Sequence, residues 1–92
     1  MYDVISKKNI DFKDTIKPML SDNYKERFKA EYWQFRIRIE KLTKMLDKYE
    51  NNQLDFKLKS PPCFLYGQLT NMINYKQSLE QRAIIENICL GE

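Results

Sequence analysis

The chain has 92 residues, with 16 lysines and arginines against 13 aspartates and glutamates, a formal net charge of +3 at pH 7, and no histidine. This length allows one small domain, and so mild a charge balance does not support the many-phosphate binding of a dedicated DNA-binding protein. Because histidine is absent, an imidazole base, a histidine-ligated zinc site and a Ser-His or Cys-His nucleophile pair are excluded, and most hydrolase chemistries with them.

The two cysteines, Cys63 and Cys89, are expected to be free thiols, as is usual in a reducing cytosol. On one continuous helix, about 26 residues at roughly 1.5 Å each would hold them about 39 Å apart, far beyond disulfide reach. No stretch approaches the roughly 18 apolar residues of a membrane span, and the first residues do not resemble a signal peptide. We therefore expect a soluble, intracellular protein.

Residues 1–20 hold several apolar side chains and Pro18 without a sustained period. We expect them to form an irregular N-terminal arm with room for one short helical turn. The cluster Ser21-Asp22-Asn23 follows, and Glu26 stands three positions after Asn23, which is the spacing of a capping box. A long helix is predicted to begin there.

This first helix is predicted over about residues 23–50, within a helical unit that spans residues 21–92. Its apolar seam recurs at alternating steps of four and three positions. The seam consists of Phe28, Tyr32, Phe35, Ile39, Leu42, Leu46 and Tyr49. Asn51-Asn52 supplies the residue type that leaves helical geometry most readily, so the helix should end near Glu50.

A connector at residues 51–60 leads to a second helix, predicted over about residues 61–90. Apolar and charged side chains alternate from Leu54 to Leu58, which indicates an extended segment with one face packed down. Ser60-Pro61-Pro62 then provides an N-cap followed by proline in the first turn. The second seam consists of Leu65, Leu69, Met72, Lys76, Leu79, Ala83, Glu86 and Leu90, and Gly91 marks the expected end.

Two heptad helices with a short connector predict an all-α, antiparallel two-helix hairpin with an irregular N-terminal arm. Lys76 lies on the second seam, so it requires an anionic partner, either in a neighbouring subunit or on a ligand. If the seams face each other, Ala30, Trp33 and Ile37 form a second stripe that would be exposed in a monomer. The second helix has the same apolar surplus, at Phe64, Tyr66, Ile73, Ile84, Ile85 and Ile88.

This surplus favours a homo-oligomer over a monomer. The expected interface residues are Trp33, Ile37, Ile73, Ile84 and Ile88. Alternatively, the N-terminal arm and the connector wrap over part of these faces.

Cations interleave with aromatic residues from Tyr24 to Arg38. Nucleobases stack on aromatic rings while lysine and arginine contact phosphates, so the mixture is typical of a nucleotide site. The same pattern is typical of core aromatics beside a solvated charged face that pairs with nearby glutamates. Neither a metal-ligand cluster nor a glycine-rich phosphate loop accompanies it, so we expect no enzyme, no metal and no cofactor.

Several runs carry a resemblance to a known family: YKERFKAEYWQ at 24–34, EKLTKMLDKYE at 40–50 and LDF at 54–56. It continues, after the proline that opens the second helix, at Gln68, Met72, Tyr75, Leu79, Arg82, Ala83 and Glu86. Over about residues 21–88 the chain resembles small bacteriophage helical-hairpin proteins that are grouped with anti-CBASS and Thoeris anti-defence nucleotide sponges. The resemblance rests on distributed spacings rather than on one invariant motif.

The resemblance implies a non-catalytic activity in the cytoplasm of an infected bacterial host. Such sponges assemble as oligomers, often hexamers, whose intersubunit pockets trap cyclic nucleotide signals of bacterial immunity. The implied ligand is a cyclic di- or trinucleotide or a molecule of the cyclic ADP-ribose type, bound through an aromatic ring near the N-terminus and a lysine early in the first long helix. Carried over to this chain, the implied ligand-binding residues are Lys29, Arg27, Arg36, Tyr24 and Phe12.

An alternative function is a protein-protein inhibitor, anti-CRISPR-like or another anti-defence factor, that docks the stripe of Trp33 and Ile37 on a host protein. A sponge would use this stripe for self-assembly, whereas a docking inhibitor must leave it free, so the oligomeric state separates the two. A structural coiled-coil adaptor, with neither ligand nor host partner, is a third possibility.

Overall fold

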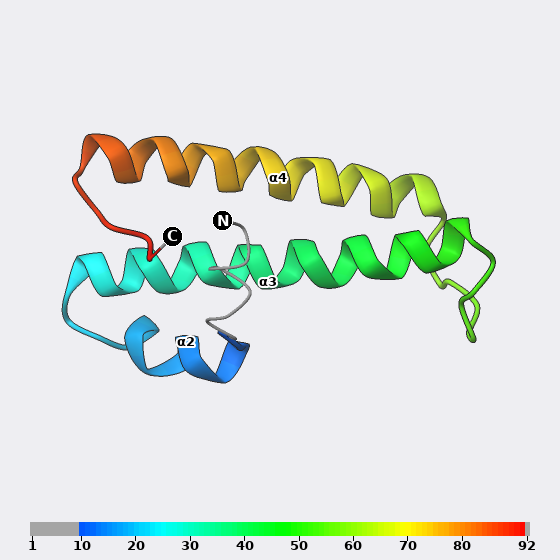
Figure 1. The fold of residues 1–92 in the computed structure, drawn as a ribbon, viewed down its shortest axis with the longest axis horizontal. Helices are drawn as coiled ribbons and strands as arrows, with labels where there is room; N and C mark the ends of the chain where they lie inside the picture. Colours follow the sequence, from blue (N-terminus) through cyan, green and yellow to red (C-terminus); the bar gives the residue numbers. More distant parts are fainter. Residues whose placement is uncertain (1–9, 92) are drawn as a thin grey trace.

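The computed structural model describes residues 10–91, which contain three helices, α2 (Phe12–Met19), α3 (Tyr24–Glu50) and α4 (Pro62–Ile85). The long helices α3 and α4 lie side by side and run in opposite directions, while α2 lies along the other side of the first half of α3 (Figure 1). No strand occurs among the described residues, so the all-α prediction is confirmed. Within the same residues no helix is long and apolar enough to cross a membrane.

The first turn of α3 is capped by asparagine, as its residue type suggests. The side-chain oxygen of Asn23 accepts a hydrogen bond from the backbone N–H of Lys25 at 2.9 Å. The reciprocal bond of the predicted capping box is replaced, because the backbone N–H of Asn23 donates to the hydroxyl of Ser21 at 3.0 Å rather than to Glu26. The loop before α3 therefore takes part in the cap.

Both long helices end in the same motif, with an asparagine in the left-handed region. Asn52 and Asn87 each have a φ of 57°. After α4, the backbone N–H of Ile88 donates to the carbonyl of Ala83 at 2.8 Å, the pattern of a Schellman motif. The second helix thus ends at Ile85 rather than near residue 90, and the chain turns back toward α3 (Figure 1).

The predicted irregular arm is in part a helix. Two turns of α2 pack on α3, and Thr15 in α2 is 2% exposed. The hydroxyl of Thr15 donates to the carbonyl of Phe12 at 2.6 Å and accepts a bond from the side-chain amide of Gln34 at 3.0 Å, which ties α2 to α3. The rest of the expected arm, residues 1–9, lies outside the described residues.

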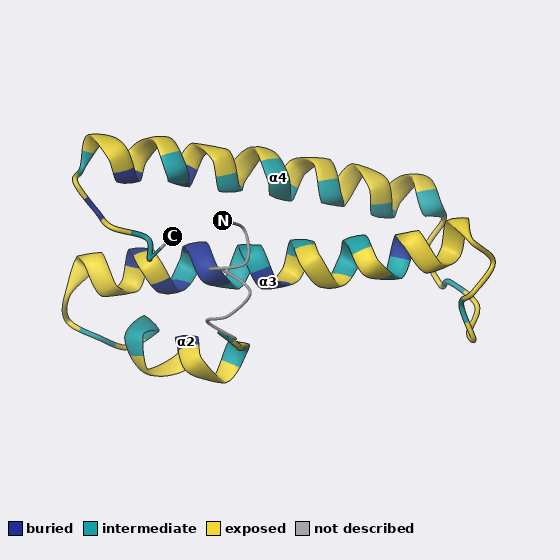
Figure 2. Cartoon of the chain, viewed as in Figure 1, coloured by how far each residue is buried: buried dark blue, intermediate teal, exposed yellow. Residues whose placement is uncertain are grey.

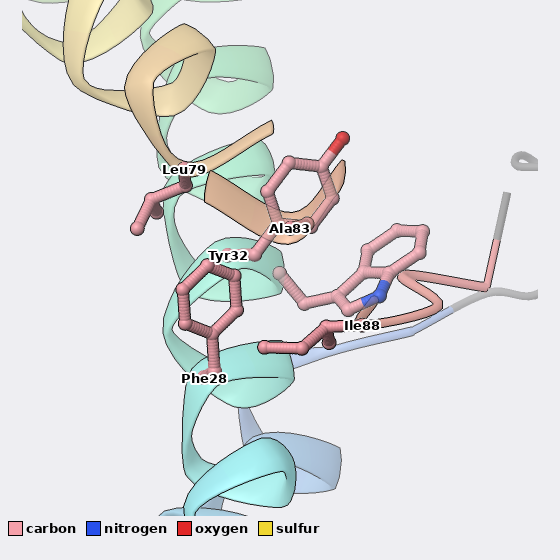
Figure 3. Packing of buried hydrophobic residues seen from close by; sticks show 6 residues of the cluster. Phe28, Tyr32, Leu79, Ala83 and Ile88 are labelled. Carbon is pink, nitrogen blue, oxygen red and sulfur yellow. The ribbon is translucent and has the colours of Figure 1, made fainter. Parts of the chain in front are cut away.

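The apolar core lies where α3, α4 and the segment after α4 meet. Figure 3 shows its packing around Tyr32, which is 0% exposed. The hydroxyl of Tyr32 donates to Glu80 in α4 at 2.9 Å, so this buried polar group is satisfied. The buried cluster consists of Phe28, Tyr32, Trp33, Leu79, Ala83 and Ile88.

The stripe of Ala30, Trp33 and Ile37 is buried within the single chain, at 3%, 9% and 7% exposure. The expectation that it would be exposed in a monomer is therefore wrong, because α2 and the segment after α4 cover it. The connector does not contribute a comparable cover, since Phe56 is 55% exposed. Figure 2 shows the buried band on α3 and the exposed outer side of α4.

The charged residues of the α4 seam find partners in their own chain. Lys76 contacts Glu80 one helical turn further on, with 2.9 Å between Nζ and Oε2. Glu86 accepts hydrogen bonds from Arg82 Nε at 3.1 Å and from the hydroxyl of Tyr24 at 2.9 Å. Neither seam charge needs a neighbouring subunit or a ligand to be paired.

Candidate functional site

A cavity of about 870 Å³ lies between α2, the first half of α3 and the C-terminal tail, residues 88–91. This volume falls in the range of roughly 300–1,000 Å³ that is typical of small-molecule sites. Its apolar wall comes from all three segments and consists of Ile10, Pro18, Leu20, Ala30, Trp33 and Leu90. The site therefore depends on the tail folding back toward α3.

Trp33 connects the tail to α3 at the wall of this cavity. Its indole Nε1 donates to the carbonyl of Leu90 at 3.0 Å, which fixes the tail backbone. The ring meets Tyr32 edge to face, with centroids 5.9 Å apart. The guanidinium carbon of Arg36 lies 5.1 Å from the centroid of Trp33, within cation-π range. Trp33 is thus held by contacts in α3 and by the tail.

The charged residues that line the cavity are of both signs. Lys17 comes from α2 and Lys29 from α3, so two lysines from different helices line the cavity. Three carboxylates, Asp14, Asp22 and Glu26, also line it. Ammonium groups bind phosphate, whereas carboxylates accept hydrogen bonds from hydroxyl and amino groups. The lining thus offers two ammonium groups to anionic groups of a ligand, three carboxylates to its hydrogen-bond donors, and an apolar wall to a flat apolar part.

Lys29 is the one residue of the five expected at the ligand that lines this cavity. Arg27 is exposed, and its Nη1 donates to the carbonyl of Ser21 at 2.8 Å, which supports the loop between α2 and α3. Arg36 lies against Trp33, and its Nη1 donates to the hydroxyl of Tyr32 at 3.2 Å. Both arginines therefore brace the elements that surround the cavity.

The two aromatic residues expected at the ligand lie elsewhere. Tyr24 faces α4, where its hydroxyl bonds Glu86 and Arg82. The bond to Glu86 raises the pKa of Tyr24 and lowers that of Glu86. The ring of Phe12 lies beneath the guanidinium of Arg38, at 5.1 Å from its centroid. Neither ring lines the cavity, whose aromatic side chain is that of Trp33.

A protein-family model described as Sequestin matches residues 22–85, which is more than half of the chain. The chain belongs to the Sequestin family. The match spans α3, the connector and α4, and it leaves α2 and the tail outside. The family name is in keeping with a sequestering role. No curated protein and no solved structure matches the chain.

The parts of the candidate site that come from α2 and from the tail of this Sequestin chain differ from the sequence-based expectation. Lys17 was assigned to an irregular arm, and residues 89–91 were assigned to the end of a helix. A period of three and four from Phe12 through Thr15 to Met19 was the available signal for α2. Asn87 was the available signal for the turn that sends the tail to the cavity.

The five residues expected at an oligomer interface differ in how far they are buried. Trp33, Ile37 and Ile88 belong to the interior of this Sequestin chain, and Ile73 is half-buried. Ile84 is 78% exposed. Of this set, Ile84 alone offers a large free surface to another molecule.

Proposed function

We propose that this protein binds a cyclic nucleotide signal of bacterial immunity and sequesters it without cleaving it. The observation that carries the proposal is the cavity in which Lys17 and Lys29 stand beside the apolar wall at Trp33. Membership of the Sequestin family supports the sequestering part. On this proposal the protein is a phage anti-defence factor of the anti-CBASS or Thoeris type, acting in the cytoplasm of the infected host.

The charges of the cavity suit the parts of such a ligand. A cyclic dinucleotide carries two phosphates, and each of the two lysines can contact one of them through a charge-assisted hydrogen bond. The carboxylates of Asp14, Asp22 and Glu26 can accept hydrogen bonds from ribose hydroxyls or from amino groups of a base. Cyclic trinucleotides and cyclic ADP-ribose isomers offer the same chemical groups and belong to the same proposal.

Sequestration is a binding function, so its strength depends on affinity and on the amount of protein. A signal that remains bound cannot reach its effector, and no bond of the ligand has to be broken. The chain is therefore proposed to be a non-enzymatic binder that needs no metal or cofactor.

The functional form is proposed to be a homo-oligomer, with a hexamer as the expected size. The exposed apolar side chains of α4, Phe64, Ile84 and Ile85, support self-association, because they are 70%, 78% and 79% exposed. The alternative of a docking inhibitor is less well supported, since Trp33 and Ile37 are buried within the chain.

Isothermal titration calorimetry tests this function directly. Purified protein, with its mass determined by light scattering, is titrated with cyclic dinucleotides, cyclic trinucleotides and cyclic ADP-ribose isomers. We expect saturable binding of at least one class with a dissociation constant in the micromolar range or below, about −8 kcal/mol or stronger. Absence of heat with every class, from a monomer, would contradict the proposal and favour a protein-docking inhibitor.

A further inference from the structure

The outer side of α4 carries almost no charge. Among the exposed residues of this helix, Arg82 is the one charged side chain, and it is directed toward α3. Its guanidinium carbon lies 5.0 Å from the ring centroid of Phe28, and its Nε contacts Glu86 at 3.1 Å. A helix surface in water is ordinarily rich in charges, and loss of charge marks the centre of protein interfaces. The outer side of α4 thus has the composition of an interface.

Seven of the exposed residues of α4 form a heptad of their own. They recur at steps of three and four along the whole helix, opposite the seam that faces α3. We name them the outer α4 face: Phe64, Gly67, Asn71, Asn74, Ser78, Gln81 and Ile85. The face is apolar at both ends and has small or uncharged polar residues between them.

Gly67 gives this face a hollow that the single chain does not use. A Cβ atom at this position would meet no heavy atom within 4 Å, so nothing in the chain requires a glycine. Glycine inside a helix is nevertheless less favourable than alanine. A shallow groove of about 450 Å³ lies here, between Phe64 and Asn71 of α4 and Phe35 of α3. Such a hollow allows the side chains of another helix to approach closely.

We propose that α4 packs antiparallel against α4 of a second copy of this chain, across a two-fold axis near Asn74. Phe64 and Ile84 are each ten residues from Asn74, about 15 Å along the helix, so Ile84 of one copy lies level with Phe64 of the other. The groove between Phe64 and Asn71 then lies level with residues 77–84 of the second copy, so Gly67 of one copy lies level with Gln81 of the other. This inference rests on the self-association in the proposed function and assigns its surface and symmetry.

The charge of the chain favours this surface over the others. Each copy has a formal net charge of +3, so two copies repel each other wherever their cations meet. The outer α4 face contains no charged residue, and it can meet itself without placing like charges together. A two-fold interface needs a self-complementary surface, and the apolar ends on either side of Asn74 provide one.

Disulfide trapping tests the register. In a background of Cys63→Ser and Cys89→Ser, the variant Asn74→Cys places one thiol of each copy near the proposed axis. Mild oxidation is expected to convert most of this variant to a covalent dimer on a non-reducing gel. The matched control Lys13→Cys, on the exposed surface of α2, should stay monomeric on the gel. Equal cross-linking of both variants, or none at Asn74→Cys, would overturn the proposal.

The unmodified protein provides a second test of direction. Cys63 is exposed at the start of α4, and in the antiparallel pair the two copies of Cys63 lie about 33 Å apart along the helices. Oxidation of the natural chain should therefore give no Cys63-Cys63 disulfide. Efficient formation of that disulfide would show a parallel pair and overturn the proposed symmetry.

The variant Gly67→Gln separates assembly from folding. Because the chain leaves room for a side chain here, we expect this variant to retain its helical circular dichroism. A glutamine would occupy the groove into which the second copy packs, so the light-scattering mass should fall below that of the natural chain. An unchanged mass would contradict the proposal.

Titration of the same samples with cyclic nucleotides distinguishes the two claims. A cross-linked Asn74→Cys dimer that binds no nucleotide refutes the proposed ligand and leaves this interface standing. A monomeric natural chain that binds nucleotide refutes the interface and leaves the ligand standing.

Discussion

Trp33 links α3 to the tail through a single side chain. It belongs to α3, its Nε1 bonds the tail at Leu90, and its ring contacts the guanidinium of Arg36. An aromatic side chain with a polar atom suits this position, because the ring packs in the core while the N–H binds a backbone carbonyl. Lys29 lies one turn earlier on α3 and brings a positive charge to the same cavity. On the proposed function, recognition at the residue scale would combine one ring with nearby cations.

Replacing Lys29 by alanine should weaken ligand binding without unfolding the chain. Lys29 is exposed, so its loss removes a charge-assisted contact to phosphate rather than core packing. We expect the dissociation constant to rise by about tenfold to a hundredfold, which corresponds to roughly 1.5 to 3 kcal/mol. Calorimetric titration of Lys29→Ala measures the change.

The matched control is Lys44→Ala. Lys44 is an exposed lysine of the same helix, outside the cavity, with a long contact of 3.9 Å to Glu40. Its removal keeps the net charge equal to that of Lys29→Ala. Equal losses of affinity in the two variants would indicate a general effect of charge and would argue against a contact at Lys29.

The helix ends determine where the tail lies. Asn87 has a φ of 57°, a conformation that asparagine adopts more readily than alanine does. The turn it makes brings Ile88 into the core and carries the tail to Trp33. Asn52 makes the same turn at the other end of the molecule, far from the cavity along α3. The two asparagines therefore have the same role at the end of a helix, but only the turn at Asn87 leads to the cavity.

Substitution of Asn87 by alanine should reduce both stability and ligand affinity. Forcing alanine into the left-handed region costs about 1 kcal/mol, which corresponds to a fall in Tm of about 4–8 °C for a domain of this size. Asn52→Ala should lower Tm by a similar amount and leave ligand affinity unchanged. Thermal unfolding followed by circular dichroism, together with calorimetric titration, measures both quantities. A loss of affinity in Asn52→Ala as large as in Asn87→Ala would contradict a specific role of the tail.

The hydrogen bond of Tyr66 between α4 and α3 should make the stability of the chain fall at high pH. This tyrosine of α4 donates a hydrogen bond to Glu50 at the end of α3, and that bond raises the pKa of Tyr66 from 10.0 to about 12. Folding therefore favours the neutral hydroxyl. The resulting stability is fully present below pH 10, the ordinary pKa of tyrosine, and it is lost as the pH rises from 10 to 12.

Denaturant unfolding of Tyr66→Phe checks this dependence. The variant should unfold at a lower denaturant concentration than the natural chain below pH 10, and the difference should shrink as the pH approaches 12. Glu50→Gln removes the charged acceptor and should reduce the same pH dependence. A difference between Tyr66→Phe and the natural chain that stays constant across this range would contradict the proposed bond.

The long helices were predictable from the sequence, whereas the short elements were not. The seam of α3 repeats over about six turns, and the asparagines after it show where the helix ends. In α2 the period of three and four covers only eight residues, its buried position is the polar Thr15, and Pro18 stands within it, so the signal is weaker than in the long helices. In α4, Leu90 continues the heptad although Asn87 has already ended the helix. Periodicity alone cannot detect such a turn.

The site was predictable only where it lies on a long helix. Lys29 could be proposed because the family resemblance implies a lysine early in the first long helix, and Lys29 lies there in α3. Lys17 and the tail reach the cavity through tertiary packing, which the spacing of residues does not encode. The same cause explains the misplaced stripe of Trp33 and Ile37, because the cover over it comes from α2 and the tail.

At the scale of the whole molecule, the surfaces on the outer sides of α3 and α4 differ. The side of α3 away from α4 is covered by α2 and the tail and bears the cavity, while α4 leaves an exposed face that lacks charge. A chain of 92 residues has a limited interior, so self-association along α4 would add buried apolar surface without closing the cavity. Ligand binding and assembly can then be altered separately by substitutions on different helices.

The most direct test of the proposed function is recovery of the ligand. A cyclic nucleotide that binds in calorimetry is incubated with the protein, the complex is separated from free ligand by gel filtration, and the protein is then denatured by heat. We expect the nucleotide to co-elute with the protein and to be released chemically intact after denaturation, as measured by mass spectrometry. Release of a cleaved product, or failure of every cyclic nucleotide to co-elute, would contradict sequestration.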